Sequence, residues 1–192
     1  MGRLLDVADG LLVVIDAQPS FYGGEPVPAQ AVALARAAWL TGVATALDVP
    51  VVVTEEDAAR NGPTDPAIAT RLPAGTPVLA KRVFDAADQP DILAAIEVTG
   101  RRTAVVVGLE TDVCVAHSAL GLLDRGMRVA VVDDATYSPG AMHDAGLRRI
   151  AAAGGELVHA KGVYYEWLRT LDAARAFQRD HPDLADPPGF SL

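Results

Sequence analysis

Several features that would define other classes of protein are scarce or missing in this sequence. Its 192 residues include one cysteine, Cys114, so no disulfide can form within the chain. Aromatic residues make up only 5% of the chain, and the formal net charge is −9. A negative balance argues against a nucleic-acid partner or an anionic membrane surface. The longest apolar runs, such as residues 11–15, are too short to cross a bilayer.

The first residues also lack the pattern of a secretory signal. Asp6 precedes the first apolar run, where such a signal would carry basic residues. A lone thiol is typical of a reducing compartment. We therefore expect a cytoplasmic protein that acts on a small molecule, with no nucleic-acid or membrane partner. The length, with no repeat or linker, predicts one domain at 1–180 and a proline-containing tail at 181–192.

Short apolar segments alternate with segments of helical periodicity along most of the chain. Strands are predicted at residues 11–15, 49–54, 78–80, 103–108, 129–132 and 156–159. Helices are predicted at residues 28–45, 91–98, 112–125, 141–153 and 164–179. Turn signals predict a loop-rich excursion at 55–77. This alternation indicates an α/β protein with three αβα layers and a central, mostly parallel, Rossmann-like sheet.

Three reactive side chains follow predicted strands. Asp16 comes directly after the first strand, Lys81 after the strand at 78–80, and Cys114 shortly after the strand at 103–108. Parallel sheets of this kind bind ligands at the carboxyl ends of their strands. Each residue alone has an ordinary explanation as a cap, a surface lysine or a core thiol. Together they predict one cleft.

Cys114 has two interpretations. On the first turn of a helix, unpaired N–H groups and the peptide dipoles favour a thiolate, which is the form that a nucleophile needs. Alternatively, Cys114 is a small buried apolar residue, as most lone cysteines are.

Three sequence blocks carry a resemblance to a known family. They are Val13-Val-Ile-Asp-Ala-Gln18, Lys81-Arg-Val-Phe84 and Gly108-Leu-Glu-Thr-Asp-Val-Cys-Val115. In this order and spacing the chain resembles the isochorismatase-like cysteine hydrolases. The resemblance implies the corresponding fold and a catalytic triad of Asp16, Lys81 and Cys114.

The resemblance also implies a mechanism. The Cys114 thiolate would attack the carbonyl carbon of a small amide or related acyl compound and form a thioester that water cleaves. Lys81 would lower the pKa of the thiol, and Asp16 would act as general base. A cis peptide bond at Leu109–Glu110 would turn the Glu110 backbone N–H inward, and with the Cys114 N–H it would form the oxyanion hole. No organic cofactor is needed.

The sequence departs from two branches of this family. The nicotinamidase branch binds a divalent metal through an aspartate and two histidines after the second strand, but residues 54–63 contain no histidine. Glu55, Glu56 and Asp57 could hold a hard cation, although such a run is usually solvated, so we expect no metal. Isochorismatases proper lack the cysteine. We therefore expect a metal-free amidase.

The residues near the triad suggest a substrate pocket. Phe21, Tyr22 and Phe84 line an apolar pocket or pack in the core. Gln18 supports Asp16 or the loop backbone, and the Glu110 carboxylate would bias the pocket toward neutral or cationic substrates. His117 contacts the pocket or a neighbouring subunit, or is structural.

Other classes of function stay open. Family members commonly form homo-oligomers, and an aromatic cluster at 164–167 is consistent with a subunit interface. A non-catalytic scaffold or ligand-binding protein is the main alternative to an enzyme. A redox-sensing thiol is a third interpretation, weakened by the lack of a second cysteine.

Overall fold

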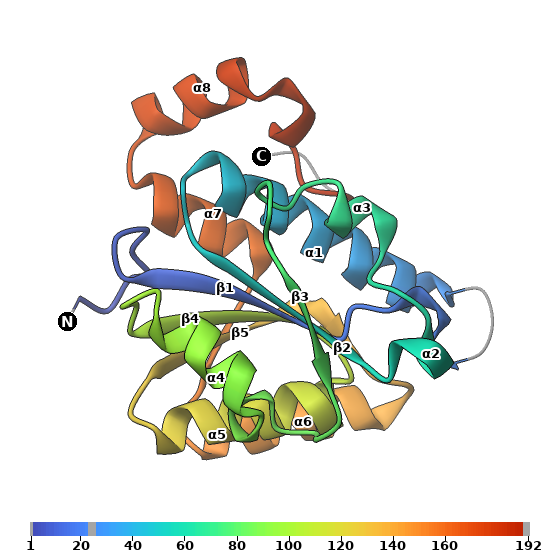
Figure 1. Ribbon diagram of the computed structural model, residues 1–192. Coiled ribbons are helices and arrows are strands. Elements are labelled where there is room, and N and C mark those ends of the chain that lie inside the picture. Colours follow the sequence, from blue (N-terminus) through green and yellow to red (C-terminus); the bar gives the residue numbers. More distant parts are fainter. Residues whose placement is uncertain (1, 23–25, 190–192) are drawn as a thin grey trace.

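A six-stranded parallel sheet forms the centre of the described chain (Figure 1). The computed structural model describes residues 2–22 and 26–189, with the side chain of Tyr22 outside that description. In spatial order the strands run β3-β2-β1-β4-β5-β6, and every neighbouring pair is parallel. Their bounds are β1 Gly10–Ile15, β2 Val51–Glu56, β3 Val78–Lys81, β4 Thr103–Leu109, β5 Arg128–Tyr137 and β6 Glu156–Val158.

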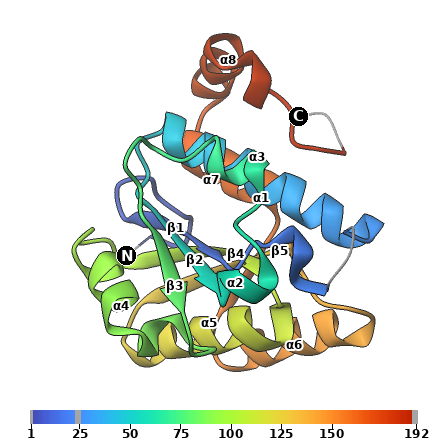
Figure 2. The same ribbon diagram turned by 45° about the vertical axis from the view of Figure 1, so that its right-hand side comes forward.

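Helices cover both faces of this sheet, which confirms the three-layer αβα prediction (Figure 2). One face carries α1 (Pro28–Ala46), α3 (Pro66–Ala69) and α7 (Ala160–Leu168), with α8 (Leu171–Asp180) outermost. The other face carries α4 (Pro90–Glu97), α5 (Ala116–Asp124) and α6 (Ala141–Ala152). Shorter turns are η1 (Pro19–Tyr22), α2 (Ala58–Asn61), η2 (Ala86–Asp88), η3 (Thr111–Val115) and η4 (Pro182–Leu184). Among the residues described, no helix combines the length and apolar character needed to span a bilayer.

The central strand β1 is buried along its whole length. Alternate residues face opposite layers, so Leu12 and Val14 pack with α1, while Leu11 and Val13 pack in the core on the α4 and α5 side. A strand covered on both faces has a continuous apolar sequence, which is why the sequence identified it. The rigid centre of the sheet thereby fixes whatever follows its carboxyl end.

The strand order reverses between β1 and β4, where doubly wound sheets open a crevice. Gly108, near the end of β4, has φ +120°, and a Cβ atom there would lie 1.9 Å from the carbonyl oxygen of Ile15. Only glycine tolerates this approach. The close contact places the residues that follow β1 beside those that follow β4.

Several predicted boundaries differ from the structure. The single helix predicted at 164–179 is wrong, because Arg169 has φ +67° and separates α7 from α8. Thr170 then caps α8 by accepting a hydrogen bond from the Ala173 N–H. No glycine or proline marks this break in the sequence. The predicted tail at 181–192 contains η4, and its Leu184 is buried with its carbonyl bonded to Trp39 Nε1 at 2.9 Å.

Candidate active site

Asp16 lies immediately after β1 and is fully buried. Its φ of +44° is a left-handed conformation that non-glycine residues rarely adopt and that is frequent at functional sites. The Thr54 hydroxyl donates to Asp16 Oδ1 at 2.7 Å, and the Asp16 N–H donates to the Thr54 carbonyl at 3.1 Å. The ends of two neighbouring strands thus fix this carboxylate.

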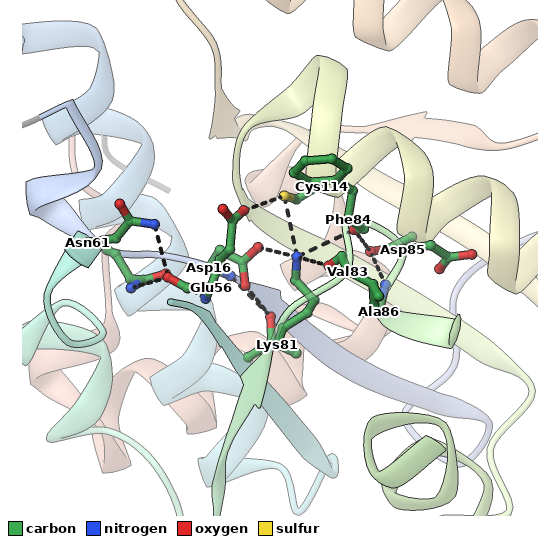
Figure 3. Close-up of polar contacts among 12 residues, drawn as sticks. Asp16, Glu56, Asn61, Lys81, Val83, Phe84, Asp85, Ala86 and Cys114 are labelled. Carbon is green, nitrogen blue, oxygen red and sulfur yellow. Dashed lines mark hydrogen bonds and ion pairs between the residues drawn. The ribbon is translucent and has the colours of Figure 1, made fainter. Parts of the chain in front are cut away.

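Lys81 is the last residue of β3, and its side chain is as inaccessible as that of Asp16. Nζ lies 2.8 Å from Asp16 Oδ2 and 3.4 Å from Cys114 Sγ (Figure 3). It also donates to the carbonyl oxygens of Val83 at 2.8 Å and Phe84 at 3.4 Å. Burial alone would lower the pKa of Lys81, but the charge of Asp16 and the sulfur of Cys114 raise it above its ordinary value. Lys81 is therefore an ammonium.

Cys114 is buried in η3, a π-helical turn that joins β4 to α5. The sequence predicted a regular helix here, but the Val115 N–H reaches back five residues to the Glu110 carbonyl at 3.0 Å. Single π turns of this kind are frequent at functional sites. The Leu109–Glu110 peptide bond just before the turn is cis, at the position that the resemblance implies.

The protonation of Cys114 corrects one expectation. Burial raises the pKa of the thiol first, the charge of Asp16 raises it further, and Lys81 only partly opposes them. Lys81 does lower the pKa of the thiol, as predicted, but burial and the charge of Asp16 outweigh this effect, so the pKa lies above its ordinary value. The sulfur instead donates to Glu56 Oε2 at 3.2 Å. Cys114 rests as a thiol.

Glu56 is the residue that sequence reasoning missed as part of this site. It ends β2, directly opposite Lys81 in the register of the two strands. Gln18 donates to the Glu56 carbonyl at 3.1 Å and accepts from the Glu56 N–H at 2.9 Å, and Asn61 donates to the same carbonyl at 3.0 Å. The strand register, which composition does not reveal, was the missing signal.

The acidic run at the end of β2 does not act as one cluster. Glu55 accepts hydrogen bonds from Thr64, whereas Asp57 pairs with Arg82 at 3.3 Å. Only Glu56 reaches the sulfur. Ligand atoms of Asp16, Glu56 and Cys114 lie within 4.8 Å of one another, a geometry that could hold a metal ion. However, the Lys81 ammonium contacts two of these three groups and already supplies a cation there.

A small cavity of about 160 Å³ opens beside these groups. Its lining consists of Glu56, Asp57, Lys81, Arg82, Val83 and Phe84. Phe84 is 54% exposed, and its ring lies edge-on to His117 with 6.0 Å between ring centroids. His117 thus contacts a residue that lines the cavity.

The other residues predicted for the pocket, where the structure describes their side chains, are not among those that line this cavity. Gln18 is fully buried and supports the loop backbone, also donating to the Gly62 carbonyl at 2.5 Å, which agrees with one of its two predicted roles. Phe21 is half-buried and packs against the core on the α1 side. Tyr22 was also predicted to line the pocket, but its side chain lies outside the part of the structure that is described. The Glu110 carbonyl accepts from the N–H groups of Val113 and Val115 at the start of η3.

Comparison with known proteins places this chain in a family. The sequence model of the family described as "Isochorismatase domain" matches residues 10–161. The chain belongs to the isochorismatase family of hydrolases. Isochorismatase domain-containing protein 2 of Rattus norvegicus is 34% identical over 154 residues, which cover 80% of this chain and 68% of the rat protein. The probable hydrolase YcaC of Escherichia coli is 30% identical over 153 residues, 75% of this chain and 73% of YcaC.

Solved structures agree with this assignment. The E. coli YcaC structure, described as an octameric hydrolase of unknown specificity, superposes with a TM-score of 0.82 at 25% identity and covers 96% of this chain and 94% of YcaC. YcaC from Pseudomonas aeruginosa, solved with hexane-2,5-diol and covalent acrylamide, gives a TM-score of 0.79 at 27% identity over 96% of this chain and 95% of that one. The shared fold confirms the isochorismatase-like αβα architecture.

Proposed function

We propose that this chain is a cysteine hydrolase that cleaves a small amide or related acyl compound through a thioester on Cys114. One observation carries the proposal. The Lys81 ammonium contacts both the Asp16 carboxylate and the Cys114 sulfur, and all three come from different strand ends. A fully buried ion pair is a poor device for stability, so its position beside a thiol favours a chemical role.

In the proposed reaction Asp16 accepts the proton of the Cys114 thiol as the sulfur attacks the carbonyl carbon of the substrate. The C–S bond forms, and the C–N bond breaks as the leaving amine takes the proton from Asp16. Water then adds to the thioester, and Asp16 accepts one of its protons. The C–S bond breaks, the acid leaves, and Cys114 recovers its proton. Lys81 remains an ammonium throughout and stabilises the thiolate while it exists.

The raised pKa of Cys114 gives this order of events a physical reason. A buried thiol next to two carboxylates does not ionise before substrate arrives, so proton removal accompanies attack on the carbonyl. The backbone N–H groups of Glu110 and Cys114, at the cis Leu109–Glu110 bond, would bind the developing oxyanion. Loss of one such donor typically costs about 2.7–4 kcal/mol.

The size of the cavity supports a small substrate. Sites for drug-sized ligands usually measure about 300–1,000 Å³, whereas this cavity measures about 160 Å³. Acrylamide, the reagent bound covalently in the P. aeruginosa relative, is itself a small amide. Phe84 and Val83 supply apolar wall, and Gln18 and Phe21 support the elements around it.

A direct experiment is to incubate the enzyme with a panel of small primary amides and measure ammonia release. Intact mass spectrometry of rapidly quenched samples should show an acyl adduct that maps to Cys114. Cys114→Ser should release no ammonia, and Cys114→Ala protein should retain uncleaved substrate detectable by mass spectrometry. Ammonia release by Cys114→Ala at the wild-type rate would overturn the thioester mechanism.

We also propose a homo-oligomer in the cytoplasm. The octameric E. coli relative supports assembly, and a free thiol without a disulfide partner is suited to a reducing compartment. Light scattering of purified protein tests the first statement. A monomer at micromolar concentration would contradict it.

A further inference from the structure

Two carboxylates approach the Cys114 sulfur, and they differ in access. Asp16 is fully buried, with Oδ1 bonded to Thr54 and Oδ2 paired with Lys81. Glu56 is half-buried, lines the cavity and accepts a hydrogen bond from the thiol at Oε2. A carboxylate has about four acceptor positions, so Glu56 can also meet a molecule that enters the cavity.

The main chain of Glu56 is held in place before any substrate arrives. Gln18 bonds both its N–H and its carbonyl, and Asn61 bonds the carbonyl again, as Figure 3 shows for Asn61. The strand register holds it opposite Lys81. The side chain therefore starts from a fixed main-chain position, which reduces the freedom that it loses when a ligand binds.

We infer that Glu56 determines substrate specificity: its carboxylate accepts a hydrogen bond from an N–H group next to the reacting carbon of the substrate. This inference rests on the proposed function and names its substrate class. Primary amides, ureas and amidinium compounds carry such donors. Esters and N,N-dialkyl amides do not.

The exchange of hydrogen bonds at the sulfur explains why this contact assists the reaction. In the resting site the thiol donates to Glu56. When the proton leaves, the thiolate and the carboxylate repel each other, and Glu56 loses its donor. A substrate N–H restores that hydrogen bond at the moment when the transition state forms, so the contact favours the transition state over the resting complex.

The test uses a pair of alkylating probes, 2-chloroacetamide and 2-chloro-N,N-dimethylacetamide, which differ in whether the amide carries N–H donors. The alkylation rate of Cys114 is measured for each by intact mass, and the ratio of the two rates is divided by the same ratio for glutathione. For the wild type we expect a normalised ratio of about tenfold or more, because hydrogen bonds to charged groups have this magnitude. Glu56→Leu should bring the ratio close to that of glutathione. Glu56→Gln, which keeps shape and a neutral acceptor, should give an intermediate ratio.

Glu97→Gln, at the exposed end of α4, is the matched control and should keep the wild-type ratio. Circular dichroism establishes that each variant is folded, and the ratio for Glu56→Gln becomes the test if Glu56→Leu does not fold. An equal ratio in wild type and both Glu56 variants overturns the inference. Selective alkylation without turnover of any amide would instead overturn the proposed hydrolysis and leave the role of Glu56 intact. Amide turnover with a ratio unaffected by Glu56 would overturn that role and leave the proposed hydrolysis intact.

Discussion

Two groups of opposite charges lie toward the carboxyl side of the sheet, and they are built differently. In the inner group, Asp16 and Lys81 are 2.8 Å apart with no exposed side-chain surface, and they meet a thiol. In the outer group, Asp134 pairs with Arg36 and His159, each at 3.1 Å, and accepts from the Ala160 N–H at 2.7 Å. His159 is half exposed.

The contacts of each group show what it does. Asp134 joins separate elements to β5, because Arg36 belongs to α1 and Ala160 begins α7. The outer group therefore connects helices to the sheet. The inner group bonds strand ends, loop carbonyls and the sulfur, and it borders a cavity. Burying an ion pair costs desolvation free energy, and the inner pair does not join helices to the sheet. A chemical role explains it better than a role in stability.

Asp16→Asn gives the largest expected contrast between the two groups. Amide hydrolysis should fall about 10²–10⁴-fold because the general base is lost. Alkylation of Cys114 by iodoacetamide should nevertheless become faster, because the Asp16 charge raises the pKa of the thiol. Asp134→Asn should change neither rate. Slower alkylation in Asp16→Asn would mean that Asp16 promotes the thiolate in the resting enzyme.

Lys81→Met should lower the free energy of unfolding by about 3–5 kcal/mol, since it leaves a buried carboxylate without its partner. Arg36→Met should cost less, about 1.5–3 kcal/mol, because Asp134 keeps His159 and the Ala160 N–H as partners. Urea denaturation measures both. The double variant Lys81→Met with Asp16→Asn should regain part of the stability. Equal losses for Lys81→Met and Arg36→Met would remove the distinction between the two groups.

Asp134→Ala should destabilise the fold by about 1–2 kcal/mol, because the first N–H of α7 loses its acceptor. The kcat/KM for an amide substrate should stay at the wild-type value. Thermal unfolding together with steady-state kinetics checks both statements. A large loss of activity at unchanged stability would assign the outer group to the reaction.

The pH dependence of labelling gives the smallest expected contrast. The pKa of Cys114 lies above its ordinary value of 9.0, and the thiolate fraction falls as pKa rises. Cys114 should therefore react with iodoacetamide more slowly than glutathione at about pH 7.5. Its rate should keep rising above the ordinary thiol pKa of 9.0. Intact mass spectrometry measures the alkylation rate at each pH. A rate that reaches a plateau below pH 9.0 would show that the thiolate already exists in the resting enzyme.

Much of the fold could be predicted because buried parallel strands have continuous apolar sequences. The strands predicted at 11–15 and 103–108 agree within one residue with β1 and β4. The prediction for β5 was too short, because the strand continues past its apolar part with a register shift that takes in Asp133 and Asp134. The left-handed Arg169 also escaped prediction, since neither glycine nor proline marks it.

The site, too, has a part that the sequence predicted and a part that it did not. The general rule that parallel strand ends meet was enough to predict that Asp16, Lys81 and Cys114 lie close together. Glu56 required the register of β2 against β3, and the protonation of Cys114 required the depth of burial. Both are properties of the folded chain. A run of three acidic residues gives no indication of which one turns inward.

Gln18 holds the main chain near the site without contacting the Glu56 carboxylate, so the fold at this point and the chemistry of position 56 depend on different atoms. It holds the end of β2 through main-chain atoms of Glu56 and Gly62, so the side chain at position 56 is not needed to hold the strand end in place. Position 56 can therefore be exchanged for other amino acids while the strand end keeps its course. Position 56 is therefore a suitable place for substitutions that aim to change the substrate of this enzyme, because the surrounding main chain is held by Gln18.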